Sequence, residues 1–91
     1  MTTREIIVAG LSANMVHYFS GALSIEELLA DAGVHLPVDE DVYDEVKLEL
    51  KDASAVFFDY LRYDEENDAI FERLYLDTAE KIAKIVYDAQ G

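Results

Sequence analysis

The 91-residue sequence contains no cysteine, and its basic residues are few. Without cysteine the chain has no disulfide framework, no thiolate nucleophile and no zinc ribbon. This composition fits a reducing compartment, and we expect the protein to lie in the cytoplasm. Internal repeats and low-complexity linkers are also lacking, so residues 1–91 are expected to form a single acidic domain.

Seven lysine and arginine residues stand against twenty aspartate and glutamate residues, which gives a formal net charge of −13. This charge argues against binding to bare nucleic acid or to an anionic membrane surface, and it favours a basic partner. Residues 37–68 carry a net charge of −9, whereas residues 1–36 carry −3 and residues 69–91 carry −1. The alternative explanation of the acidic composition is general solubility or adaptation to high salt. Neither explains why the acids are concentrated in the middle of the chain.

Residues 6–23 carry no charged side chain, which raises the question of a membrane span or a signal peptide. A span needs about 20 strongly apolar residues, whereas this run includes Ser12 and His17. A secretory signal needs a basic start, and here Arg4 is offset by Glu5. We therefore expect a buried helix in this segment.

The first helix is predicted to begin with a capping box, because Thr2 is followed three residues later by Glu5. Gly21 is placed to end the same helix. A short β-strand over residues 6–9 is the alternative, because β-branched residues are frequent there. The predicted buried face of the helix comprises Ile7, Leu11, Met15, Tyr18 and Ala22.

A second capping box, Ser24 with Glu27, predicts a short helix that stops at Gly33. Pro37 disfavours helical angles at the residue before it, so residues 34–37 are predicted to form a connector. The apolar side of the short helix comprises Leu28, Leu29 and Ala32.

Residues 41–63 have the period of a long amphipathic helix, which Asp39 or Asp41 is expected to cap. A similar pattern begins at Ala69 and runs nearly to the end of the chain. The predicted fold is therefore all-α. We expect a small four-helix, bundle-like domain in which the long acidic third helix and the fourth helix form an antiparallel hairpin.

The two long helices each have a defined apolar face. The face of the third helix comprises Val42, Val46, Leu50, Ala53, Val56, Phe57, Tyr60 and Leu61. The face of the fourth comprises Phe71, Leu74, Tyr75, Thr78, Ile82, Ile85, Val86 and Ala89. The core that they share is predicted to contain Val46, Leu50, Phe57, Leu74, Ile82 and Ile85.

The sequence contains no catalytic signature, and we expect no enzymatic activity, no cofactor and no metal site. His17 and His35 have no neighbour at metal-ligand spacing, and they are expected to lie in or at the edge of the first helix and in a loop. The acidic run 64–68 begins like a calcium loop, but its twelfth position is Tyr75 rather than glutamate. Residues 25–34 have spacing similar to a helix-turn-helix, but phosphates would repel the acidic helix that follows.

The acidic residues of the middle segment are the candidate binding site. Four of them form a ridge on one side of the predicted third helix. Carboxylates three or four positions apart on a helix lie about 5–6 Å apart, so we expect Asp41, Glu45, Glu49 and Asp52 to form a row of negative charge comparable in pitch to a phosphate strand. Glu49 falls within the apolar face, so we expect it either to find a tyrosine or lysine partner or to face another protein. The ridge comprises Asp41, Glu45, Asp52 and Asp59. The full set of candidate partner-binding residues is Asp39, Glu40, Asp41, Asp44, Glu45, Glu49, Asp52, Asp59, Tyr63, Asp64, Glu65, Glu66 and Asp68.

Aromatic residues near this acidic segment have two interpretations, helix-hairpin packing or a binding hot spot. Phe58 is predicted to point away from the apolar face, and Tyr63 falls on the acidic side. The group comprises Phe57, Phe58, Tyr60, Tyr63, Phe71 and Tyr75.

The charge pattern favours a non-enzymatic inhibitor whose acidic middle occupies the basic, nucleic-acid-binding surface of another protein. In size, acidity and lack of a catalytic signature, the chain resembles small phage-encoded inhibitors of host defence, including anti-CRISPR and anti-restriction proteins that imitate DNA. This is a resemblance of type, since no motif identifies a family, and it implies action in the cytoplasm of a host cell. The alternatives are an immunity protein or antitoxin that neutralises a basic nuclease toxin, and an acid-rich structural or halophilic domain. No direct contact with nucleic acid or membrane is expected, and a homodimer is an open alternative.

Overall fold

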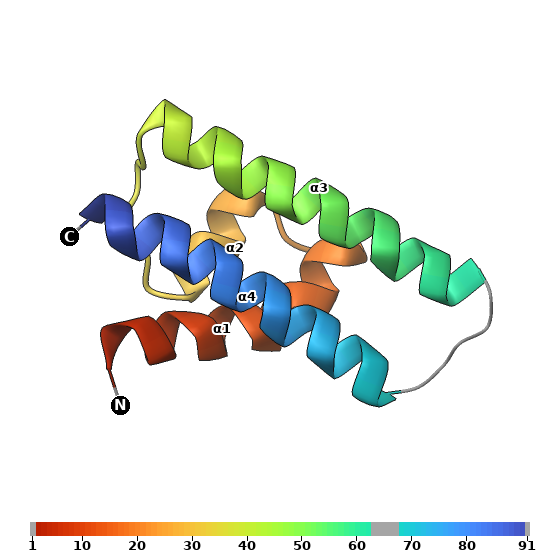
Figure 1. Cartoon of the computed structure of the whole chain (residues 1–91). Helices are drawn as coiled ribbons and strands as arrows, with labels where there is room; N and C mark the ends of the chain where they lie inside the picture. Colours follow the sequence, from red (N-terminus) through yellow and green to blue (C-terminus); the bar gives the residue numbers. More distant parts are fainter. Residues whose placement is uncertain (1, 63–67, 91) are drawn as a thin grey trace.

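The structure is a computed structural model that describes residues 2–62 and 68–90 of the chain. Throughout these residues the chain is α-helical or in connecting turns, as predicted, and none of them lies in a strand. The alternative strand over residues 6–9 is wrong, because these residues lie inside the first helix. The four helices are α1 (Thr3–Phe19), α2 (Ile25–Asp31), α3 (Glu40–Arg62) and α4 (Asp68–Gln90), shown in Figure 1.

Local signals set both ends of α1. The Thr2 hydroxyl accepts a hydrogen bond from the Glu5 backbone N–H at 3.2 Å, and the Glu5 carboxylate accepts from the Thr2 N–H at 3.4 Å. Beyond the last turn, Gly21 has a φ of +87°, a left-handed conformation that glycine adopts without strain. The Ala22 N–H donates to the His17 carbonyl at 2.9 Å, which completes a Schellman motif. The helix α1 therefore begins at the predicted capping box and ends at the predicted glycine.

The short helix α2 uses the same two devices. The Ser24 hydroxyl accepts from the Glu27 N–H at 3.2 Å, and the Glu27 carboxylate accepts from the Ser24 N–H at 3.2 Å. After the helix, Gly33 has a φ of +88°, and the Val34 N–H donates to the Leu29 carbonyl at 3.0 Å. Val34 and Leu29 are both buried, as the apolar contact of a Schellman motif requires.

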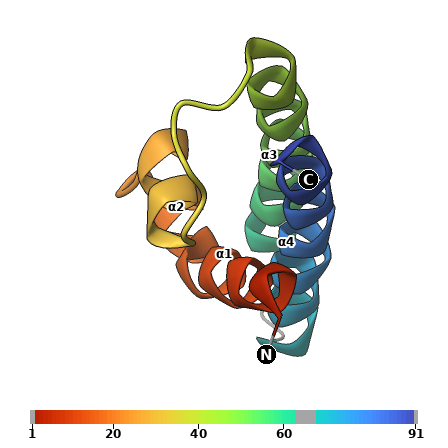
Figure 2. The ribbon, with the colours of Figure 1, turned by 90° about the vertical axis from the view of Figure 1, so that its left-hand side faces the viewer.

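The helices α3 and α4 lie side by side and run in opposite directions, which confirms the predicted hairpin (Figure 1). Figure 2 shows that α1 crosses this hairpin, packing on α4, while α2 packs on α1. The helix α3 begins at Glu40, and the Tyr43 N–H donates to the Asp39 carbonyl at 2.9 Å. Asp39 is therefore at the capping position, and the alternative cap, Asp41, lies in the first turn.

One continuous core joins all four helices. Of the core predicted for the last two helices, Leu74 and Ile85 are partly buried and the other members are buried. The buried side chains of the described residues are Ile7, Leu11, Met15, Phe19, Leu28, Leu29, Ala32, Val34, Val46, Leu50, Ala53, Phe57, Thr78, Ala79, Ile82, Ala83 and Val86.

The predicted buried face of α1 is wrong at its end. Phe19 rather than Tyr18 continues the row that every fourth residue forms, and its ring stacks on Phe57 with 4.9 Å between centroids. Tyr18 is half-buried at the edge of this row. Ala22 is exposed, because the helix has already ended at the Schellman motif.

The predicted apolar faces of α3 and α4 are also too long. Val56 and Leu61 are exposed, and Tyr60 is only partly buried. Val56 lies at the margin of the apolar face, and the last turn of α3 extends beyond α1, so fewer side chains cover Leu61 (Figure 1). Ala89, near the end of α4, is exposed as well.

Gly10 sets the distance between α1 and the end of α2. A Cβ atom added at Gly10 would lie 2.9 Å from the Ala32 Cα and 3.2 Å from the Ala32 Cβ. The nearer contact is with the backbone, which cannot rotate away as a side chain does. Glycine at this position therefore allows the two helices to pack closely, at some loss of helix propensity.

We expect the variant Gly10→Ala to lower the free energy of unfolding by about 1–2 kcal/mol, because overpacking strain exceeds the gain of roughly 1 kcal/mol in helix propensity. Chemical denaturation followed by circular dichroism measures the change. The control is Ala13→Gly, at an exposed position of the same helix, which should cost about 1 kcal/mol through propensity alone. A Gly10→Ala variant that is more stable than the wild type would show that the helices do not approach so closely.

Candidate functional site

The outward side of α3 carries the predicted acidic ridge. Asp41, Glu45, Asp52 and Asp59 are all exposed, so the structure places the four carboxylates on one solvent-facing side of a single helix. At a rise of 1.5 Å per residue, the ridge extends over about 27 Å. The buried residues Val46, Leu50, Ala53 and Phe57 lie on the opposite side of the same helix and fix its orientation.

The remaining candidate residues fall into three groups. Three lie at or near the start of α3 and are exposed, as Asp68 is at the start of α4; they are Asp39, Glu40 and Asp44. Glu49 is partly buried, at the margin of the apolar face, and no hydrogen bond or ion pair within the described residues reaches it. The predicted sites Tyr63, Asp64, Glu65 and Glu66 lie outside the described residues.

The ridge is hardly neutralised by positive charge. Within residues 2–62 and 68–90 the ion pairs are Arg62 with Asp59 at 4.0 Å and Arg73 with Asp77 at 3.9 Å, both between exposed side chains. Only the first involves the ridge. Like charges four positions apart on a helix destabilise it by about 0.2–0.5 kcal/mol per pair, and Glu45 has such neighbours on both sides. The like-charge pairs around Glu45 therefore do not stabilise α3.

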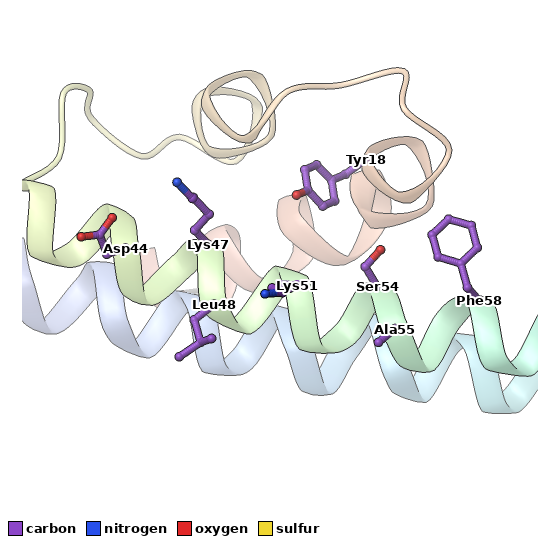
Figure 3. A pocket seen from close by; sticks show the side chains of 8 residues that line it. All are labelled: Tyr18, Asp44, Lys47, Leu48, Lys51, Ser54, Ala55 and Phe58. Carbon is purple, nitrogen blue, oxygen red and sulfur yellow. The ribbon is translucent and has the colours of Figure 1, made fainter.

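A groove that the sequence does not reveal lies beside the ridge, between α3 and the segment that carries Tyr18. Figure 3 shows the side chains that line this groove, and its volume is about 550 Å³. Two lysines in its lining, Lys47 and Lys51, belong to α3 and form no ion pair within the described residues. The complete lining is Tyr18, Asp44, Lys47, Leu48, Lys51, Ser54, Ala55 and Phe58.

One polar contact links α3 to α2 at the end of this groove. The Tyr43 hydroxyl donates to the Glu26 carboxylate at 3.1 Å, and the Lys47 ammonium lies 5.6 Å from the centre of the Tyr43 ring. Partial desolvation raises the pKa of Tyr43, and the hydrogen bond to Glu26 raises it further. Tyr43 therefore stays in the neutral form that can donate to a carboxylate.

Most of the predicted aromatic group packs in or against the core. Phe19, which the prediction did not include, packs with it. Phe57 stacks on Phe19 and meets Phe71 edge to face, with 5.5 Å between centroids. Tyr75 packs beside the same rings. Phe58 is half exposed at 50 %, as its predicted direction requires, and faces the groove. Most of this group is thus used for packing, and Phe58 is available to a ligand.

The described residues contain no group of three or more histidine, aspartate and glutamate side chains that could hold a metal ion. His17 and His35 are both exposed, the first on α1 and the second in the connector after α2. Within the same part of the chain, none of the helices has the length and hydropathy required to cross a membrane.

Comparison with known proteins gives no match: no family model fits the chain, and no curated protein or solved structure is significantly similar to it.

Proposed function

We propose that this protein is a non-enzymatic inhibitor that places the acidic ridge of α3 in the basic, nucleic-acid-binding surface of another protein. The observation that carries the proposal is the exposure of Asp41, Glu45, Asp52 and Asp59 on one side of one helix. Lysines and arginines that bind phosphates also bind carboxylates, because both ligands are oxyanions.

The dimensions of α3 support this proposal. Its 23 residues span about 35 Å, close to the roughly 34–36 Å of one turn of duplex DNA. A basic groove that follows one turn of DNA could therefore contact the whole ridge. The helix is held straight against α4 and needs little ordering on binding, so less conformational entropy is lost.

The energetic cost of the ridge also supports a binding role. The like-charge pairs Asp41 with Glu45 and Glu45 with Glu49 oppose helix formation, and within the described residues the one ion pair on the ridge is Arg62 with Asp59. Acids added only for solubility could be spread over all four helices, yet the net charge of residues 37–68 is −9. A basic partner would remove this repulsion when it binds and would gain favourable contacts.

The partner can be captured with the immobilised chain from a lysate of candidate host cells at low and high salt. We expect a basic, nucleic-acid-binding protein that is retained at about 50 mM salt and released well below 1 M, because salt at 1 M shortens the Debye length to about 3 Å. The control column carries the variant Glu45→Lys/Asp52→Lys. Equal retention of the same protein on both columns, or retention that salt does not affect, would refute the proposal.

A further inference from the structure

The groove between α3 and Tyr18 has more ammonium groups than carboxylates in its lining. Its lining contains two ammonium groups, Lys47 and Lys51, and the carboxylate of Asp44, while the Glu26 carboxylate that accepts from Tyr43 lies beyond one end. The whole chain has seven basic residues and a net charge of −13, so few places on it combine two lysines; a second hollow with a small excess of basic residues is lined by Arg4, Asp77, Glu80, Lys81 and Lys84. Neither lysine forms an ion pair within the described residues.

Two hydroxyl-bearing residues line the same groove. Figure 3 shows the Tyr18 ring above α3 with its hydroxyl on the side of the two lysines, and the Ser54 hydroxyl pointing up from α3 on the side of Phe58. Ser12 and Ser20 donate to carbonyls of their own helix, but neither Ser54 nor Tyr18 makes a hydrogen bond within the described residues. The groove therefore presents hydroxyl donors as well as ammonium donors; none of them makes a hydrogen bond or ion pair within the described residues, and Lys47 lies over the Tyr43 ring.

The walls of the groove are apolar. The Phe58 ring stands up from α3 at one end, and the Tyr18 ring covers part of the opening (Figure 3). Leu48, exposed at 59 %, lies along the outer edge with Ala55. The groove is open to solvent, and its volume of about 550 Å³, like those of the other surface hollows of the described residues, falls in the roughly 300–1,000 Å³ range of small-molecule sites; such sites combine apolar walls with a few polar groups.

We propose that this groove binds a small amphipathic organic acid, with its carboxylate or phosphate on Lys47 and Lys51 and its apolar body against Phe58 and Tyr18. The charge of the two lysines selects the anion, and the hydroxyls of Ser54 and Tyr18 supply further donors to its oxygens. The proposal does not depend on the acidic ridge, because none of its four residues lines the groove; of the candidate partner-binding residues only Asp44 does.

The test is titration of the ¹⁵N-labelled protein with octanoate, octyl phosphate and octanol, each below its aggregation concentration. We expect both acids to shift the amide signals of residues 44–58 and of Tyr18, and octanol to have little effect. A response to only one acid would identify the head group as carboxylate or phosphate. In Lys47→Gln/Lys51→Gln the dissociation constant should rise by about tenfold or more, because charge-assisted hydrogen bonds are the stronger ones.

Two variants separate this site from other effects. Lys81→Gln/Lys84→Gln removes two exposed lysines of α4 and should leave the titration unchanged. Glu45→Lys/Asp52→Lys should also retain the site, so failure of the ridge proposal and failure of the groove proposal are distinguishable. The groove proposal is overturned if neither acid shifts these signals, if octanol shifts them equally, or if Lys47→Gln/Lys51→Gln binds as well as the wild type.

Discussion

Reversing two carboxylates of the ridge, in the variant Glu45→Lys/Asp52→Lys, is expected to weaken partner binding by about 100-fold or more. Each reversal removes a charge-assisted contact worth about 1.5–3 kcal/mol and adds repulsion, and each 1.4 kcal/mol is a factor of ten. The fold should be unaffected, because both side chains are exposed and surface charges contribute little to stability. Surface plasmon resonance on the captured partner measures the change.

The kinetics of the same variant give a second result. Opposite potentials accelerate encounter and salt screens them, so the wild-type association rate should fall steeply between low and physiological salt. The double reversal should lose much of this dependence. The control, Glu72→Lys/Asp88→Lys, changes the net charge equally but at exposed positions of α4, and it should bind nearly as the wild type does. Equal losses in both variants would mean that net charge, rather than the ridge, governs binding.

Truncating Leu50 to alanine is expected to lower the free energy of unfolding by about 2–5 kcal/mol, because the side chain is fully buried between the long helices. For a domain of this size each kcal/mol shifts Tm by about 4–8 °C, so the loss is large. Ile82→Ala, on the facing side of α4, should have a similar effect. Thermal unfolding followed by circular dichroism measures both.

Leu48 provides a matched control for Leu50. It is the same residue type, two positions earlier in the same helix, but 59 % exposed. Leu48→Ala should change stability by less than about 0.5 kcal/mol, as surface substitutions usually do. If Leu48→Ala were as destabilising as Leu50→Ala, α3 would face its neighbours differently from the structure.

The helix ends were predictable because their signals are local. The capping boxes of Thr2 and Ser24 and the glycines at 21 and 33 act within a few residues, so the sequence contains all the information required. The hairpin was predictable because its apolar period continues over many turns. The buried residue at the end of α1 could not be predicted, because Tyr18 and Phe19 are both aromatic. Only the position of Phe57 on another helix decides which of the two rings is enclosed.

The two candidate binding surfaces, the ridge and the groove, also differ in how far the sequence could predict them. The ridge follows from one helix and its period, so its exposed carboxylates could be predicted from residues 41–59 alone. The groove brings Tyr18 of α1 next to Lys47 and Ser54 of α3, and this proximity depends on how α1 crosses the hairpin. The contact of Gly10 with Ala32 likewise joins two elements whose packing no local pattern specifies.

Competition for the partner tests the central claim most directly. Fluorescently labelled nucleic acid is first bound to the purified partner, and its anisotropy is followed as the wild-type protein is added. The account predicts complete displacement by the wild type and little displacement by Glu45→Lys/Asp52→Lys at the same concentration. A ternary complex, in which the partner holds nucleic acid and this protein together, would contradict it.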